Sequence, residues 1–201
     1  MASTLRNLFR TLTWHDFARV DRTPPGPGEF VHGAQAGVDI VPSGFALDHV
    51  PGGLRIRDSI VVAVTFNSRQ SWVANWVFTR PAAFQDGLLA HEQGHYNLLA
   101  LLARDFFLGL MQLKANTYPD ARAAQADLTA VSDRTAAKGQ DLQDRYDADT
   151  VNGSDAAQQA RWLGFIQTAM TTPVNPPQTA ADGTPIKCPI LSVLSQNGIT
   201  I

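Results

Sequence analysis

The segment His91-Glu92-Gln93-Gly94-His95 constrains this chain more than any other feature, because it has the form His-Glu-x-x-His inside an apolar, helical pattern. Side chains four residues apart lie on one face of a helix, so His91 and His95 can direct ring nitrogens at one ion. Glu92 lies about 100° around the helix, where its carboxylate can reach a water beside that ion without being a ligand. The motif predicts a Zn²⁺ site with His91 and His95 as ligands and Glu92 as the general base of a hydrolase.

Composition makes a chance occurrence of the motif rare. The chain has 5 histidines, and its only glutamates are Glu29 and Glu92. Random placement of so few residues would produce the motif with a probability on the order of one in a thousand. An exposed polar helix turn without metal is the alternative, and the leucines on both sides of the motif argue against it.

Length and charge exclude several classes of protein. A chain of 201 residues can bury one sizeable core, so we expect a single domain over residues 1–201. The net charge of −2 and the lack of a Lys/Arg run argue against a nucleic-acid partner. The lone Cys188 excludes an intrachain disulfide framework. No apolar run of about 18 residues is present, so no membrane span is expected.

The compartment is not assigned by the sequence. Residues 1–13 contain arginines but lack the apolar core of a secretory signal. We therefore expect a cytoplasmic protein if this is the native start, and a secreted or periplasmic one if a signal has been removed. The oligomeric state is not indicated either.

The remaining pattern predicts an α+β fold, with mainly antiparallel strands first and a helical part after them. We expect strands over about 12–80, including 60–66 and a strand beginning at 71–73, because these runs are β-branched or aromatic. Helices are expected over 81–113, about 120–146, and from an N-cap at Ser154 to before Thr172. The tail 173–201 is expected to be irregular, with a short strand at 190–194.

A catalytic zinc commonly has three protein ligands, and the motif supplies two. No His or Glu follows His95, so the third must be an aspartate downstream, an upstream histidine, or a less usual group. Asp105 is excluded because it lies about 15 Å further along the same helix. An antiparallel second helix would bring Asp141, Asp144 and Asp147 level with the motif after about 20 residues. We predict Asp147, with Asp144 and the upstream histidines as alternatives; the latter are His15, His32 and His49.

Several motifs occur together and in order along the chain. They are Leu12-Thr13-Trp14-His15-Asp16-Phe17, Ser71-Trp72-Val73, Leu88-Leu89-Ala90-His91-Glu92-Gln93-Gly94-His95-Tyr96, Tyr146-Asp147-x-x-Thr150 and Gln159-x-x-Trp162. This set, over about residues 12–165, resembles a group of small, uncharacterised bacterial proteins predicted to be secreted zinc-dependent proteases. The resemblance implies a zincin-like metallopeptidase fold, with the His-Glu-x-x-His motif on a long active-site helix.

Two positions depart from the pattern of that family. Members often carry Asp where this chain has Asn97, and His where it has Asn152. Asparagine can donate a hydrogen bond but is a poor zinc ligand. The resemblance therefore supports the fold more strongly than it supports catalysis.

The predicted function is hydrolysis of peptide bonds by a zinc-activated water, with a peptide or protein as substrate. Glu92 would move the proton, and Tyr146, or less readily Tyr96, could donate a hydrogen bond to the oxyanion. Core packing is the favoured alternative for both tyrosines, as it is for Trp72 and Trp76, which could otherwise line the substrate cleft. The rival function is a non-catalytic zinc-binding or partner-binding domain on the same scaffold, and a metal-free structural protein is the least favoured.

Overall fold

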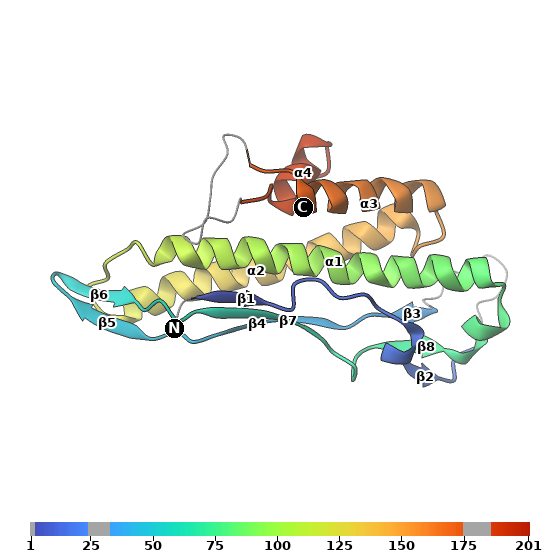
Figure 1. Ribbon diagram of the computed structural model, residues 1–201, viewed down its shortest axis with the longest axis horizontal. Helices are drawn as coiled ribbons and strands as arrows, with labels where there is room; N and C mark the ends of the chain where they lie inside the picture. The colour runs from blue at the N-terminus through green and yellow to red at the C-terminus, as the bar shows by residue number, and fades with distance from the viewer. Residues whose placement is uncertain (1–2, 24–32, 175–185) are drawn as a thin grey trace.

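The computed structural model describes residues 3–23, 33–174 and 186–201, and it has a mixed α+β fold with most strands before the helices. Figure 1 shows a layer of strands on one side of the two longest helices and the two remaining helices on the other side. The helices are α1 (Ala82–Leu113), α2 (Ala121–Thr150), α3 (Ala156–Thr171) and α4 (Ile190–Gln196), with short 3₁₀ helices η1 (Trp14–Asp16) and η2 (Asn75–Thr79).

The strands form three small sheets in the described residues, with the orders β1-β7-β4, β2-β8-β3 and β5-β6. Antiparallel pairing joins β4 to β7, β3 to β8 and β5 to β6, whereas β1–β7 and β2–β8 are parallel. The predicted mainly antiparallel arrangement thus holds for three of these five pairings. The strands are β1 (Thr4–Arg6), β2 (Ala18–Val20), β3 (Ala34–Gln35), β4 (Val38–Ser43), β5 (Leu47–Val50), β6 (Gly53–Ile56), β7 (Val61–Phe66) and β8 (Trp72–Ala74).

Helix α1 is the central element, and it is buried on both sides. Tyr96, Phe106 and Leu110 belong to a core cluster shared with the strands, while Leu98 and Leu101 belong to a second cluster shared with α2, α3 and α4. A helix of 32 residues with apolar side chains around most of its circumference needs partners on two faces. Among the described residues, no helix is long and apolar enough to cross a membrane.

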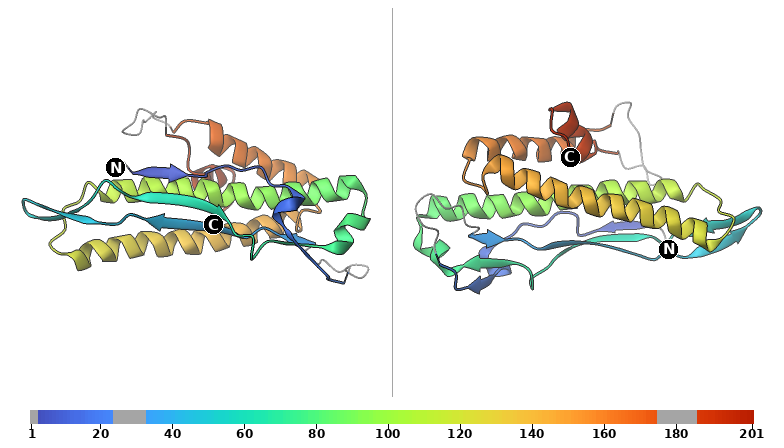
Figure 2. Two further views of the ribbon diagram at one scale, coloured as in Figure 1. Left: turned by 60° about the horizontal axis from the view of Figure 1, so that its bottom comes forward. Right: turned by 180° about the vertical axis from the view of Figure 1, so that it is seen from behind.

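Helix α2 runs antiparallel to α1, which is the arrangement on which the prediction of Asp147 depended (Figure 2). Three glycines mark the line of approach: Gly94 lies against Tyr146, Gly139 against Leu102 and Gly109 against Val131. The helix begins at Asp120, whose side chain accepts a hydrogen bond from the backbone of Ala123. It ends where Val151 adopts the left-handed conformation, with φ at 50°.

Several predicted boundaries need correction. Residues 190–194 form part of helix α4 and not a strand, because Ile190, Val193 and Leu194 bury one helical face. Helix α2 continues to Thr150, four residues beyond the predicted end, and α3 is capped by Asp155 and not by Ser154. Strand β1 precedes the predicted strand-rich part. Within the tail predicted to be irregular, residues 175–185 lie outside the described residues, as does His32.

Candidate metal centre

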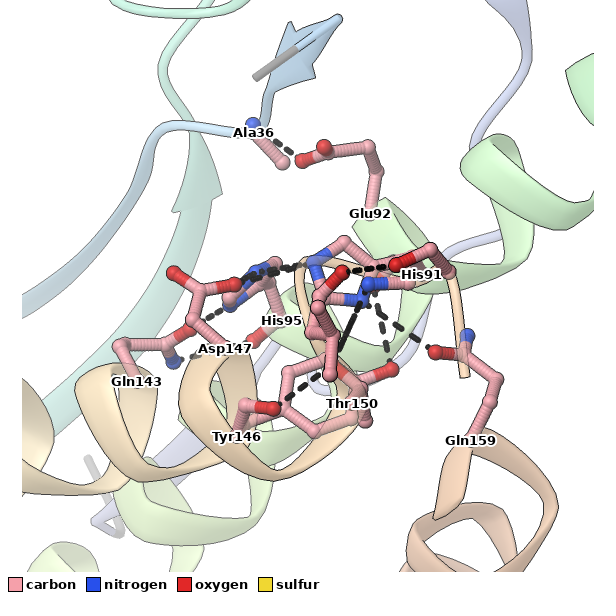
Figure 3. A network of polar contacts seen from close by, with 12 residues as sticks. Ala36, His91, Glu92, His95, Gln143, Tyr146, Asp147, Thr150 and Gln159 are labelled. Atoms are coloured by element: carbon pink, nitrogen blue, oxygen red, sulfur yellow. Dashed lines mark hydrogen bonds and ion pairs between the residues drawn. The ribbon is translucent and has the colours of Figure 1, made fainter. Parts of the chain in front are cut away.

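Helices α1 and α2 bring two histidines and one carboxylate to a single point. His91 and His95 lie one turn apart on α1, and Asp147 faces them from the last turn of α2 (Figure 3). The Asp147 Oδ1 atom is 3.0 Å from His91 Nε2 and 2.9 Å from His95 Nε2, and the two Nε2 atoms are 3.1 Å apart. Each of the three residues offers a ligand atom within 4.8 Å of the others, so they form a possible metal-binding triad.

The donor set and its spacing fit a tetrahedral metal ion. Ligand bonds of about 2.0–2.1 Å to zinc place neighbouring ligand atoms about 3.3 Å apart in a tetrahedral site. The three observed separations are a few tenths of an ångström shorter than that. Two imidazole nitrogens and a carboxylate at such distances repel one another unless a cation or a shared proton lies among them.

The other ring nitrogen of each histidine already has a partner. His91 Nδ1 lies 3.3 Å from Gln159 Oε1 on α3 and 3.4 Å from Thr150 Oγ1, and His95 Nδ1 contacts Gln143 Oε1 on α2 (Figure 3). An amide oxygen can only accept, so each Nδ1 carries the proton and donates it. When the imidazoles are neutral, both Nε2 atoms then present lone pairs toward Asp147, and this is the tautomer that a metal requires.

Glu92 is buried beside the triad, with 2 % of its surface exposed. Its Oε2 accepts a hydrogen bond of 2.7 Å from the backbone N–H of Ala36, which follows β3 (Figure 3). Burial raises the pKa of Glu92 above its usual value, and the neighbouring histidines oppose that rise. A carboxyl group with a raised pKa takes up a proton more readily than an exposed carboxylate, which is a property of a general base.

The electrostatics of the cluster favour a positive charge at its centre. Burial would raise the pKa of Asp147, but hydrogen bonds from His91 and His95, which form when a proton lies on Nε2, outweigh it and hold the pKa well below its usual range. Burial would lower the pKa of His95, but Asp147 and Glu92 outweigh it and raise that pKa. The two carboxylates therefore attract a proton or a metal ion to the histidines.

The triad opens onto a pocket of about 450 Å³. Glu92, His95 and Asp147 line it together with residues of β3, β4, β8 and α2. Trp72 lines the same pocket, and its indole N–H donates to Gln35 Oε1 at 3.0 Å. Trp76, which the sequence also offered as a cleft residue, is 9 % exposed and lines a separate pocket between α1 and the loop after α2.

Close packing behind the histidines involves Tyr146. Its ring stacks on His91 with centroids 4.8 Å apart, and its hydroxyl donates to the backbone oxygen of His91 at 3.4 Å. Tyr146 is 0 % exposed, and burial raises the pKa of its hydroxyl, which stays a neutral donor. The surroundings of Tyr146 therefore favour core packing over a catalytic role. Its hydroxyl donates to the backbone of α1, and Tyr146 does not line the pocket. Tyr96 likewise donates away from the site, to the backbone oxygen of Asn7 at 3.0 Å.

The competing ligands lie elsewhere or have other partners. Asp144 lines the pocket, but its Oδ1 accepts from Gln140 at 2.7 Å and it is not in the triad. Among the described residues, His15, His49 and Asp141 also fall outside the triad.

Asn97 and Asn152, the two positions that depart from the pattern of the resembled proteins, have identifiable surroundings. Asn97 accepts a hydrogen bond from Gln93 at 3.0 Å, and Gln93 in turn binds the backbone of Arg10 and Leu12. Asn97 therefore belongs to the contact between α1 and the N-terminal segment. Asn152 has φ of 50° in the turn after α2, and the next residue, Gly153, packs so closely on His91 that a Cβ would lie 2.8 Å from it.

Four residues of the site were not predicted as functional: Ala36, Gln143, Thr150 and Gln159. Gln143, Asp147 and Thr150 share one face of α2, so a signal existed at helical spacing around the predicted ligand. Ala36 acts through its backbone, so its side chain carries no signal. Gln159 stands in the Gln159-x-x-Trp162 motif, but that motif does not indicate that its amide contacts His91 from another helix.

Comparison with known proteins gives one match. Residues 62–155, slightly less than half of the chain, match a family described as a bacterial protein of unknown function (DUF922). The matched region contains the whole triad and Glu92, but not β3, β4 or Gln159. No curated protein and no solved structure matches the chain.

Proposed function

We infer that this chain is a zinc-dependent peptidase with a zincin-like active site. The observation that carries the proposal is the convergence of His91 Nε2, His95 Nε2 and Asp147 Oδ1, beside a buried Glu92 and at the wall of an open pocket. An amide oxygen faces the Nδ1 atom of each histidine, which favours the tautomer that binds metal, and the described residues offer three ligands, as catalytic zinc sites do.

The residues divide the chemistry between them. His91, His95 and Asp147 would hold the ion, which when bound supplies Lewis acidity and lowers the pKa of a water. Glu92 takes the proton of the attacking water and delivers it to the leaving amine, a role that its raised pKa supports. Gln143, Gln159 and Thr150 orient the two imidazoles.

The pocket favours an extended peptide as the substrate. The backbone of β3 and the segment after it lines the pocket beside Glu92, and β3 is an edge strand of its sheet in the described residues. An extended chain can hydrogen-bond to such an edge, which would lay a peptide bond next to Glu92.

One observation favours the alternative of a non-catalytic zinc site. The Glu92 carboxylate already accepts the Ala36 N–H at 2.7 Å, and a buried carboxylate with a backbone donor can have a purely structural role. A fourth protein ligand would be expected for a structural zinc site, whereas an enzyme keeps one position for water.

Zinc content and hydrolysis together test the proposal. Elemental mass spectrometry of wild type, Glu92→Gln and His95→Ala should give about one zinc per chain in the first two and little in the third. With quenched fluorescent peptides as substrates, Glu92→Gln should lose at least about 100-fold in kcat, because the proton carrier is removed. Full activity in Glu92→Gln would contradict the role of Glu92. Zinc without any hydrolysis in the wild type would favour the non-catalytic alternative, and absence of zinc after reconstitution would overturn the proposal.

A further inference from the structure

The pocket at the triad continues into a second pocket of about 450 Å³ further along α1. The two share four lining residues, namely Val38, Leu99, Gln140 and Gln143. The groove so formed has β4 as one wall and α2 as the other, with α1 at its floor. Figure 2 (left) shows this arrangement from the strand side, with β4 running beside α2.

The second pocket is apolar at its base. Leu99 and Phe106 of α1 form the floor, Ile40 and Pro42 come from β4, and Ala136 comes from α2. Its charged lining residues, Asp39 and Asp133, are both acidic. These surroundings suit an aliphatic or aromatic side chain and disfavour an acidic one.

Strand β4 is an edge strand in the described residues, so backbone N–H and C=O groups on its outer side can pair with an extended peptide. In the described residues β4 pairs with β7 on one side only, and it contains Pro42, a residue that sheets tolerate at their edges. An extended peptide lying along this edge would run from the triad toward Phe106. The occupant is thus the same extended chain that the first pocket takes, because the two pockets are continuous.

The distance along α1 sets which part of the peptide would enter. Leu99 lies one turn beyond His95, about 6 Å along the helix axis, and Phe106 lies about 16 Å beyond it. An extended chain advances about 3.3 Å per residue, so these distances correspond to roughly two to five residues.

We propose that the second pocket is a specificity subsite that takes a large apolar side chain two to five residues from the cleaved bond. The position of the subsite relative to a cleaved bond rests on the proposed peptidase function. The binding of an apolar side chain in the second pocket does not require cleavage. It can therefore be tested in a protein that does not hydrolyse its ligand.

Two neighbouring alanines of α2 provide the test and its matched control. Ala136 and Ala137 are both exposed, but only Ala136 lines the second pocket. Ala136→Trp should fill the pocket, whereas Ala137→Trp adds the same side chain outside it. Both are made in the zinc-loaded Glu92→Gln protein, and circular dichroism checks that each folds.

The probes are fluorescein-labelled decapeptides of alanine and glycine in which one central position is Leu, Phe, Asp or Gly. We expect the Leu and Phe peptides to bind at least about tenfold more tightly than the Gly peptide by fluorescence anisotropy. Ala136→Trp should abolish that preference and Ala137→Trp should keep it. Equal binding of all four peptides, no binding of any, or equal effects of the two tryptophans would overturn the subsite.

Cleavage products separate this proposal from the peptidase function. Mass spectrometry of a digested peptide library should show large apolar residues enriched two to five positions from the cut in wild type, and not in Ala136→Trp. Cleavage without this enrichment would overturn the subsite and leave the function standing. The apolar binding preference without any cleavage would support the subsite and count against the function.

Discussion

At the scale of single residues, the two histidines depend on groups that never touch the metal position. Gln159 and Thr150 lie near His91 Nδ1, and Gln143 contacts His95 Nδ1. These contacts select the tautomer and fix the planes of the rings before an ion arrives. Residues of α2 and α3 thus orient the two histidine ligands, which lie on α1.

Removing either amide should weaken metal binding without removing a ligand. We predict that Gln143→Leu and Gln159→Leu each reduce zinc affinity about 10–100-fold, because the imidazole loses its orienting acceptor. Competition with a chromophoric chelator measures the change. Gln125→Leu is the control, since Gln125 is an exposed glutamine of α2 whose side chain donates to Thr129 at 3.2 Å and lies outside the site. Affinities equal to that of the control would show that these amides do not orient the histidines.

At the scale of elements, the site requires α1 and α2 to approach very closely. A Cβ at Gly94 would lie 2.1 Å from the Tyr146 hydroxyl, so the second variable position of the motif has no room for a side chain. The same contact stacks Tyr146 on His91 and holds Asp147, the next residue, level with the histidines.

Glycine at position 94 should therefore be essential for packing. We predict that Gly94→Ala lowers the free energy of unfolding by about 2 kcal/mol or more, because the two helices must separate. Gly87→Ala is the matched control: Gly87 is also in α1 and a Cβ there meets nothing within 4 Å. That variant should be stabilised by up to about 1 kcal/mol through helix propensity. Urea unfolding of both proteins measures the contrast, and similar midpoints would contradict it.

At the scale of the whole molecule, α1 also anchors the C-terminal segment. Arg104 donates to the backbone oxygens of Ala169 and Cys188, each at 2.7 Å, and Asp105 Oδ2 accepts from the backbone of Ile190 at 2.9 Å. These bonds attach α3 and α4 to the face of α1 opposite the strands. Burial raises the pKa of Asp105 to about 6, although Arg104 opposes that rise.

This carboxyl group should make stability depend on pH. A pKa of about 6 in the folded chain, against 3.8 as the ordinary value, means that the folded state binds the proton more tightly. Its stabilising contribution is fully present below about pH 4 and is lost as pH rises through about 6, a change of at most about 3 kcal/mol.

Asp105→Asn isolates this contribution, because asparagine keeps an acceptor for Ile190 but does not titrate. The difference in unfolding free energy between wild type and Asp105→Asn should shift in favour of wild type as pH falls from 7 to 5. Urea titrations at both values measure it. A difference that stays constant with pH would show that Asp105 has no raised pKa.

Helix periodicity explains how much of the site could be predicted. His91, Glu92 and His95 follow from spacing on one helix, and Asp147 follows from the rise per residue of an antiparallel return. The strand predicted at 190–194 was wrong because periodicity over so few residues does not distinguish a strand from a helix. A short apolar run fits a strand or a helix equally well, and α4 exists because Ile190, Val193 and Leu194 dock on the second core cluster.

The sequence by itself determined the elements that carry the candidate site, because a motif of five residues and two long apolar periodicities specify α1, α2 and the two histidines. For the third ligand it favoured Asp147 but left Asp144 and the upstream histidines open. Only the tertiary structure decided how those atoms are oriented and what lies beside them. The Ala36 N–H on Glu92, the Gln159 amide at His91, and the groove between β4 and α2 join segments 56 or more residues apart. Contacts of that kind depend on packing between elements, which local pattern does not encode.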